Sequence, residues 1–301
     1  MKMADHSRTV GLLGIGLVGR AVVPLLQKAG FEVVGYAPSQ ASRDALRDLG
    51  GRPVDSVADV ARACGIVVLA VFNSDQVEQV VEAENGLLSV APPEGLPRII
   101  VNTSTCEPDR MVALDARIAD SAVFVEMPIS GTSTQIARGE GVGLIGGREA
   151  DIDRAENVLA AICPRRFTLG SIGSGGKAKL AVNLVLGLNR AAIAEGIVFA
   201  EKLGIDPRAF LDVARNSAAY SQVMDVKGPK MVERDYLPLS KVSQTLKDFT
   251  IMRDYGEAAG QRLPFAETYI DMMEGCIRAG EGEWDNAAIL EEIKRRRTGS
   301  A

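Results

Sequence analysis

Short apolar runs alternate with amphipathic stretches through the first half of the chain. The runs are rich in Val, Ile and Leu, and the stretches between them repeat apolar positions every three or four residues. This order is typical of β-α-β units that build a parallel sheet. It predicts strands at residues 9–13, 32–36, 66–71, 98–102, 123–126, 143–146 and 166–169, and helices at residues 18–28, 42–49, 57–63, 74–81 and 108–120.

The pattern changes after Leu169. A turn-rich link at residues 170–176 precedes a long apolar helical pattern at 177–203. Further helices are predicted at residues 207–216, 222–231, 242–260, 264–279 and 286–296. We therefore expect two domains, an α/β domain at residues 1–169 and an all-helical domain at residues 170–301. Pro24 lies inside the first predicted helix and is expected to kink or loosen it.

A glycine-rich turn joins the first predicted strand to the first helix, and it reads Gly14-Ile15-Gly16-Leu17-Val18-Gly19. In such a turn the first glycine permits a tight bend, the second lets the backbone approach a pyrophosphate, and the third allows close helix packing. The helix N-terminus adds N–H groups and a positive dipole end. Glycines that merely turn the chain are the alternative. The context favours a nicotinamide dinucleotide on a doubly wound Rossmann sheet.

The end of the second predicted strand bears on the choice of dinucleotide. An acidic residue there usually holds the ribose hydroxyls of NAD, but this chain has Ala37. Ser39 and Arg43, one helical turn apart, could receive the 2′-phosphate of NADP. Arg43 as an ordinary solvated helix residue is the alternative. The sequence thus leans to NADP, with NAD left open.

A possible carboxylate site follows the predicted strand at residues 123–126. Ser130, Gly131 and Thr132 offer hydroxyl and backbone N–H groups at a strand exit, where a substrate carboxylate could be held. An ordinary Ser/Thr turn has the same composition. Both interpretations stay open at this point.

Lys179 stands near the start of the long helical pattern, and Asn183 follows four residues later. That spacing puts the amine and the amide on one helix face. A lysine amine can exchange a proton with an alcohol oxygen while hydride moves to or from a cofactor. Lys177 is an equally good candidate by position alone.

Composition narrows the classes of function. The 301 residues carry a net charge of −5, which argues against a general affinity for nucleic acid or an anionic membrane. The basic run at residues 294–297 is interpreted as the solvated end of a terminal helix. Four scattered cysteines indicate neither a metal cluster nor a disulfide framework, so a reducing cytoplasm is expected.

The one histidine, His6, lies in a polar leading tail. Its position argues against a histidine triad, a histidine-ligated metal or a histidine general base. The tail lacks an apolar signal segment, and no uninterrupted apolar run approaches the length of a membrane span. We expect neither secretion nor a membrane anchor.

Taken together and in chain order, these motifs resemble the β-hydroxyacid dehydrogenases of the 6-phosphogluconate dehydrogenase superfamily. That family includes 3-hydroxyisobutyrate dehydrogenase and 2-hydroxy-3-oxopropionate (tartronate semialdehyde) reductase. The resemblance covers nearly the whole chain after the tail. Each motif is modest, but five in the right order are specific: the glycine turn, Ser104-Thr105, Pro128-Ile129-Ser130-Gly131, Gly173-Ser174-Gly175 with Lys179 and Asn183, and Lys247-Asp248.

The resemblance implies hydride transfer between a nicotinamide and a small 3-hydroxyacid or its semialdehyde, held between the two domains. It implies Lys179, rather than Lys177, as the general acid/base, and Asn183 as the residue that orients substrate. The remaining implied roles are carboxylate binding by Ser130, Gly131 and Thr132, a place near the cofactor for Asn73 and Thr105, and a reach toward the nicotinamide end for Lys247.

Several positions depart from the family pattern. Thr132 stands where glycine is common, Val182 where the first of two asparagines is common, and Ser240 where an aromatic is frequent. These departures leave the substrate open. Residues 73–78 also resemble four-carbon sugar-acid members such as L-threonate dehydrogenases, which is the main alternative.

Three other functions are compatible with a dinucleotide-binding first half. A 6-phosphogluconate-type oxidative decarboxylase needs a larger helical part, and imine reductases usually lack the lysine found at Lys179. A non-catalytic dinucleotide sensor would need only the glycine turn. The apolar helix at residues 178–200 predicts a homodimer or homotetramer, with burial in a monomer core as the alternative. Trp284, at a predicted turn, either covers the substrate cleft or anchors the surface.

Overall fold

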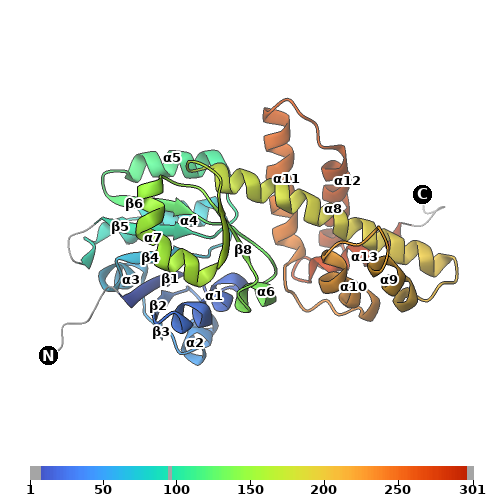
Figure 1. Ribbon diagram of the computed structural model, residues 1–301, viewed down its shortest axis with the longest axis horizontal. Helices are drawn as coiled ribbons and strands as arrows, with labels where there is room; N and C mark the ends of the chain where they lie inside the picture. The colour runs from blue at the N-terminus through green and yellow to red at the C-terminus, as the bar shows by residue number, and fades with distance from the viewer. Residues whose placement is uncertain (1–7, 94–96, 297–301) are drawn as a thin grey trace. The chain divides into compact units, whose positions relative to one another are not determined.

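The computed structural model describes residues 8–93 and 97–296. The chain divides into two compact units, residues 1–179 and 180–301 (Figure 1). His6 and Arg297 lie outside the described residues. The domain boundary expected after Leu169 falls before this division, inside the first unit, and stays a prediction.

A six-stranded sheet forms the frame of the first unit, and its neighbouring strands all run parallel. The strand order is β3-β2-β1-β4-β5-β6. The order reverses between β1 and β4, which is where doubly wound sheets bind ligands at the carboxyl ends of their strands. The strands are β1 (Thr9–Leu13), β2 (Glu32–Tyr36), β3 (Arg52–Pro53), β4 (Ile66–Leu69), β5 (Arg98–Asn102) and β6 (Ala122–Glu126).

Helices cover both faces of this sheet because its strands are apolar on both sides. Val10 and Leu12 of β1 pack into one core, whereas Leu13 packs into another. The first core is shared with α1 (Leu17–Lys28), α6 (Ser133–Ala137) and α7 (Glu149–Ile162). The second is shared with α3 (Val57–Ala63), α4 (Ser74–Glu82), the short helix η2 (Leu87–Ser89) and α5 (Pro108–Ile118). The amphipathic α2 (Gln40–Asp48) packs through its buried Leu46.

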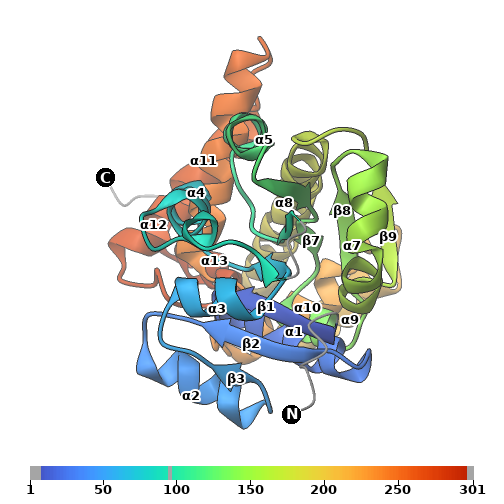
Figure 2. The same cartoon turned by 90° about the vertical axis from the view of Figure 1, so that its left-hand side faces the viewer.

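A second, three-stranded sheet follows the first in the chain. Its order is β7-β8-β9, with β7 (Ile129–Ser130) antiparallel to β8 (Val142–Ile145) and β8 parallel to β9 (Arg165–Thr168). Figure 2 shows β8 and β9 beside α7, in green. A bridge between Glu126 and Gly146 links β6 to this sheet. The strands predicted at residues 143–146 and 166–169 therefore belong to a separate sheet.

Two helices near the ends of this unit bear on the expectations from the sequence, α1 at Pro24 and α8 at the glycine link. Helix α1 runs without a break through Pro24, whose ring lies on the exposed side. Helix α8 (Ser174–Lys202) begins three residues before the predicted start at 177, so part of the glycine link is helical. The remaining link keeps its turn because Gly170 and Gly173 have positive φ, 131° and 93°.

The second unit is helical, as the sequence predicts. Its elements are the rest of α8, α9 (Pro207–Arg215), α10 (Val223–Glu233), α11 (Val242–Ala258), α12 (Pro264–Arg278), η4 (Asn286–Ala288) and α13 (Ile289–Arg295). The buried ammonium of Lys227 on α10 lies 2.7 Å from the carboxylate of Asp285, which also accepts from the backbone N–H of Leu239. This pair ties the turn before α11 to the core of the unit.

Helix α8 is long and apolar enough to cross a membrane by length and composition, a test that core helices of water-soluble proteins also pass. The helix is not an uninterrupted apolar run, because Arg190 and Glu195 lie within it. Arg190 is buried and donates to the hydroxyl of Tyr269 at 2.5 Å. That contact places this part of α8 against the other helices of its unit.

Arg98 is the largest side chain buried in the first unit, with 1% exposure. Its guanidinium donates to the carbonyl oxygens of Ala61 at 2.6 Å, Val90 at 3.1 Å, and Leu87. Burial lowers the pKa of Arg98. The cation is held by main-chain dipoles, including the carboxyl end of α3.

Candidate active site

The glycine turn lies at the carboxyl end of β1, beside β4. Gly14 has a φ of 95°, and an added Cβ there would overlap the carbonyl of Ala70. A Cβ on Gly19 would overlap the carbonyl of Gly14, whereas one on Gly16 would meet nothing within 4 Å. Two of the glycines thus serve packing, and Gly16 leaves open space where a phosphate could approach.

The first turn of α1 suits a diphosphate. Gly16 is the N-cap residue and supplies no side-chain cap, and the turn has no acidic residue. The free backbone N–H groups and the positive end of the helix dipole therefore lie at the N-terminus of α1, with no acidic side chain beside them. In this turn Ile15 is buried, Leu17 is exposed and Val18 is half-buried. The residues present fit the pyrophosphate of a dinucleotide.

At the end of β2, Ser39 and Arg43 are close to one another but already engaged. Ser39 caps α2 by accepting from the backbone N–H of Ser42, at 3.1 Å. Arg43 donates to the carbonyl oxygens of Ala37 at 2.7 Å and Pro38 at 3.0 Å. These contacts hold the guanidinium across the end of β2, where a ribose 2′-substituent would lie in a doubly wound fold.

Asn73 and Thr105 stand on the loops that follow β4 and β5, two neighbouring strands. Asn73 caps α4 and accepts from the backbone N–H of Gln76 at 3.0 Å. The two loops are joined, because the hydroxyl of Ser104 accepts from the N–H of Val71 at 3.0 Å. Both predicted residues thus lie at the same edge of the sheet as the glycine turn.

The predicted carboxylate site combines an exposed loop with a helix cap. Ser130 ends β7, and Gly131 adopts a positive φ of 143°. Thr132 caps the five-residue helix α6, and its hydroxyl makes a reciprocal capping box with Gln135. The hydroxyl of Thr132 is therefore used within the fold.

The structure separates the two candidate lysines. Lys177 is exposed, whereas Lys179 is buried with 7% exposure. The ammonium of Lys179 donates to the carbonyl oxygen of Ile129 at 2.6 Å, next to Ser130 in the chain. The amine thus lies beside the predicted carboxylate site, which supports the choice of Lys179 made from the family resemblance.

Glu126 ends the strand that precedes the Ser130 loop, and the sequence predicts no role for it. It is 2% exposed, and one carboxylate oxygen accepts from the backbone N–H groups of Gly175 at 2.8 Å and Gly176 at 3.3 Å. Burial raises the pKa of Glu126, although these N–H donors and the nearby Lys177 oppose the shift. No local signal could predict this contact, because its partners are about fifty residues apart.

In the second unit, Asn183 donates to the carboxylate of Asp248 at 3.2 Å. Lys247, the predicted nicotinamide-end residue, lies 3.0 Å from the other oxygen of that carboxylate. Asp248 was noted as part of a motif, but sequence reasoning assigned it no function. These contacts indicate a structural function for Asp248, because its carboxylate joins Asn183 and Lys247, the two predicted site residues of this unit.

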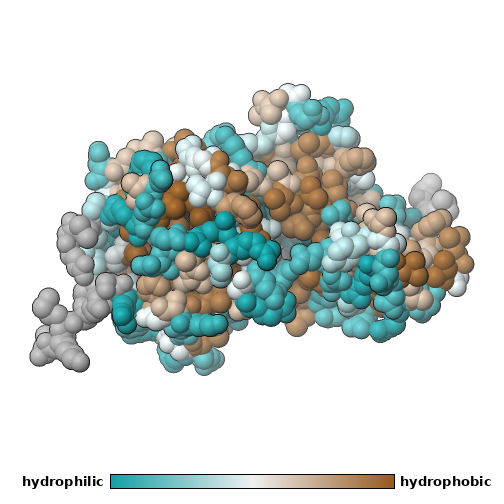
Figure 3. Space-filling model, viewed as in Figure 1, coloured by the Kyte–Doolittle hydropathy of each residue, from teal (hydrophilic) through white to brown (hydrophobic). Residues whose placement is uncertain are grey.

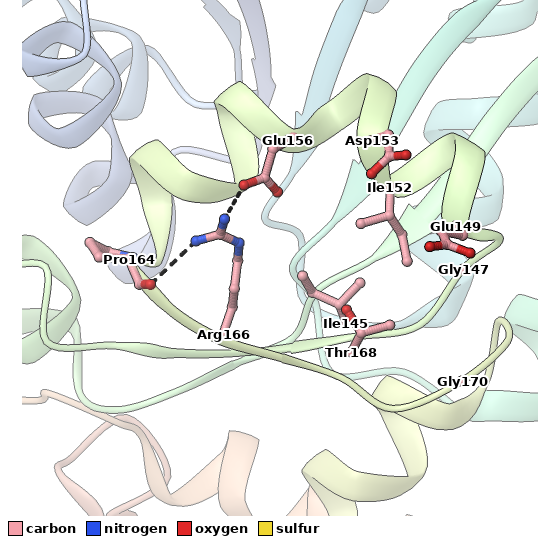
Figure 4. Close-up of a pocket in the computed structure, with 10 residues that line it drawn as sticks. All are labelled: Ile145, Gly147, Glu149, Ile152, Asp153, Glu156, Pro164, Arg166, Thr168 and Gly170. Atoms are coloured by element: carbon pink, nitrogen blue, oxygen red, sulfur yellow. Dashed lines mark hydrogen bonds and ion pairs between the residues drawn. The ribbon is translucent and has the colours of Figure 1, made fainter.

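A pocket of about 670 Å³ opens elsewhere in the first unit, between α7 and β9. Figure 4 shows Arg166 of β9 reaching to Glu156 of α7 and to the carbonyl of Pro164, with Asp153 and Glu149 further along the helix. None of the predicted site residues lines it. It is a surface groove apart from the site described above.

Comparison with known proteins agrees with this geometry. Residues 9–170 match the family model described as the NAD binding domain of 6-phosphogluconate dehydrogenase. Residues 173–293 match the model described as NAD-binding of NADP-dependent 3-hydroxyisobutyrate dehydrogenase. The chain is 30% identical to an L-threonate dehydrogenase from Cupriavidus necator, over 95% of this chain and 96% of that one.

This chain belongs to the β-hydroxyacid dehydrogenase family. A 2-hydroxy-3-oxopropionate reductase from Escherichia coli is 25% identical over 95% of this chain and 97% of its own. A solved 3-hydroxyisobutyrate dehydrogenase from Salmonella typhimurium superposes with a TM-score of 0.86 at 25% identity, covering 94% and 99% of the two chains. The predicted fold class, the use of NAD or NADP, and the hydroxyacid dehydrogenase class of this family member are thereby confirmed.

Proposed function

We propose that this β-hydroxyacid dehydrogenase transfers hydride between NADP and a small 3-hydroxyacid or its semialdehyde, with Lys179 as general acid/base. The observation that carries the proposal is the buried ammonium of Lys179 on the carbonyl of Ile129. This contact puts the amine next to the Ser130 loop, where we propose that the substrate carboxylate binds. A proton-exchanging group must lie close to the oxygen it serves.

When bound, the nicotinamide supplies a hydride acceptor or donor. In oxidation, the carbinol C–H bond breaks with transfer of hydride, and the neutral amine of Lys179 accepts the hydroxyl proton. In reduction, the ammonium returns that proton to the carbonyl oxygen. Asn183 keeps the reacting oxygen aligned, and Ser130 with the Gly131 N–H holds the substrate carboxylate, a positioning role whose loss can be large.

The substrate candidates are two. The reductase from Escherichia coli and the Salmonella structure, by their names, favour a compound like tartronate semialdehyde or 3-hydroxyisobutyrate. The L-threonate dehydrogenase from Cupriavidus necator favours a four-carbon sugar acid, and residues 73–78 point the same way. A polar substrate of either kind suits Ser240, which stands where relatives often carry an aromatic.

The choice of NADP rests on Ser39 and Arg43 and on the missing acid at Ala37. Arg43 is held across the end of β2 by two carbonyl oxygens, so its guanidinium is already positioned for an added phosphate. Asn73, Thr105 and Lys247 complete the proposed dinucleotide contacts.

We further propose a cytoplasmic homodimer or homotetramer that binds neither nucleic acid nor membrane. Figure 3 shows apolar patches on the surface of the second unit, including the end of α8 at the right. Val185 and Phe199 of α8 are more than half exposed, at 58% and 63%. An apolar surface of this kind is typical of a contact between copies. Light scattering that gave a monomer mass at working concentration would contradict this assembly.

The function is tested by following nicotinamide absorbance with 3-hydroxyisobutyrate, tartronate semialdehyde and L-threonate, each with NAD and with NADP. Turnover is expected with at least one acid, and faster with NADP. Tight dinucleotide binding without turnover on any of them would instead favour a dinucleotide sensor.

A further inference from the structure

A buried carboxylate at the start of α8 has no part in the chemistry described so far. Glu126 ends β6, and one of its oxygens accepts from the N–H groups of Gly175 and Gly176. The first N–H groups of a helix have no partner within the helix, so an acceptor from elsewhere is needed to satisfy them when they are buried. Glu126 fills that need from a strand.

The surroundings of this carboxylate are built around it. A Cβ added to Gly146 would overlap the oxygen of Glu126, and a Cβ added to Gly175 would overlap the carbonyl of Leu144. Both positions hold glycine. Any larger residue there would push the carboxylate and the helix apart, so the contact depends on a close approach of three backbone segments.

The same two segments meet a second time. Three residues after Glu126, the carbonyl of Ile129 accepts from Lys179, which lies one helical turn after Gly175. The segment from β6 to β7 is thus joined at one end to the first turn of α8 and at the other end to its second turn. With only the second contact, the amine could move with the fraying end of the helix. With both, the register between helix and strand is fixed.

We propose that Glu126 is a positioning residue for Lys179, holding the first turn of α8 in register so that the amine lies beside the Ser130 loop. This rests on the proposed function, in which Lys179 exchanges the proton. Glu126 touches neither substrate nor cofactor in this scheme. It acts through the helix, and its removal displaces an amine that is itself unchanged.

The test compares Glu126→Ala, which removes the contact, with Glu126→Asp and Glu126→Gln, which keep an acceptor. We expect kcat of Glu126→Ala to fall about 100-fold, the effect of a misplacement near 1 Å. Its dinucleotide Kd should change less than about twofold, because the glycine turn of α1 is untouched. The kcat of the Asp and Gln variants should be at least about tenfold higher than that of Glu126→Ala.

A second measurement does not depend on turnover. Reductive methylation followed by mass spectrometry gives the labelling of Lys179 relative to the exposed Lys177 in the same molecule. We expect that ratio to rise severalfold in Glu126→Ala and to stay near the wild-type value in Ser56→Ala. Ser56 caps α3 in the same unit through the N–H of Asp59, so it controls for the loss of a helix cap alone.

Should Glu126→Ala fail to fold, Glu126→Met carries the same test, because it also removes the acceptor oxygens and keeps most of the side-chain volume. Wild-type kcat and an unchanged labelling ratio in a folded variant that lacks the acceptor would overturn the proposal. Equal losses of kcat and dinucleotide affinity would also overturn it, since they indicate general damage. Full activity of Lys179→Met would instead overturn the proposed function, whatever the Glu126 variants do.

Discussion

The amide nitrogen of Asn183 donates to the carboxylate of Asp248, 65 residues further along the chain, at a distance of 3.2 Å. Asp248 is buried with 7% exposure, and its other oxygen lies 3.0 Å from the ammonium of Lys247. One carboxylate therefore fixes which end of the Asn183 amide faces α11. The oxygen end of the amide takes no part in this hydrogen bond.

Replacing Asp248 should disturb both of its partners. In Asp248→Ala the amide of Asn183 can rotate, and the half-buried Lys247 loses its counter-charge. We expect kcat/KM to fall by about 10- to 100-fold. Asp248→Asn keeps an acceptor for Asn183 and should lose less. Steady-state kinetics on folded protein checks this, and equal kcat/KM for Asp248→Ala and wild type would contradict it.

The two lysines at the start of α8 offer a matched pair. Lys179→Met keeps most of the length of the side chain and removes the amine, so we expect kcat to fall about 100- to 10,000-fold with the dinucleotide affinity retained. Lys177→Met changes an exposed residue on the same turn and should leave kcat within about twofold. Similar losses in both variants would remove the assignment of Lys179.

The glycine turn offers a second pair. Gly19→Ala forces a Cβ against the carbonyl of Gly14, so it should destabilise the fold by at least about 1 kcal/mol and weaken dinucleotide binding. Gly16→Ala has open space around it and should leave the melting temperature nearly unchanged, while it lowers dinucleotide affinity by blocking the phosphate. Thermal unfolding and a dinucleotide titration separate the two. Unaltered affinity in Gly16→Ala would place the phosphate elsewhere.

The preference for NADP should depend on Arg43. In Arg43→Gln the loss of a charge-assisted contact to the 2′-phosphate should lower kcat/KM for NADP about tenfold and leave that for NAD unchanged. Arg47→Gln alters an exposed arginine of the same helix that pairs with Asp44, and it serves as the control. A parallel loss with NAD and NADP would mean that Arg43 supports α2 rather than the cofactor.

Glu126 should make stability depend on pH. Burial raises the pKa of Glu126 above its ordinary value of 4.5, so the unfolded chain releases this proton at a lower pH than the folded one. The stability contributed by Glu126 is therefore complete below pH 4.5 and declines as pH rises through the raised pKa. Gln has no such proton. Glu126→Gln should gain stability relative to wild type over that window.

Urea unfolding of both proteins at a series of pH values measures this difference. The exposed Glu84→Gln is the control for a change of net charge alone. A difference between Glu126→Gln and wild type that stays flat with pH would contradict the expectation. A gain in stability together with a loss in kcat would show that the ionised carboxylate serves activity at the expense of folding.

The local parts of the fold could be predicted from the sequence. β1, β2, β5 and α3 have the predicted bounds, because alternation, caps and glycines are short-range signals. α7 was missed although Ile152, Ala155 and Leu159 have helical spacing, since it lies between two stretches that were assigned as strands. The two-residue strands β3 and β7 are too short to leave a pattern.

The site divides in the same way. The glycine turn and the capping residues Ser39 and Asn73 are readable because their partners are neighbours in the chain. The sequence distinguishes Lys179 from Lys177 only through the family resemblance. The difference in burial between the two lysines is visible only in the structure. Trp284 stacks on Tyr236 with ring centres 5.3 Å apart, a contact between residues that no sequence spacing relates.

Arg98 has a consequence for how the first unit comes apart. The carbonyl oxygens that bind its buried guanidinium come from α3 and from the segment around η2. A partly opened state in which either segment moved away would leave a buried charge without its acceptors. Such states are disfavoured, and the two segments are coupled to β5. Amide hydrogens there should exchange together in one cooperative opening, although the segments lie on separate stretches of the chain.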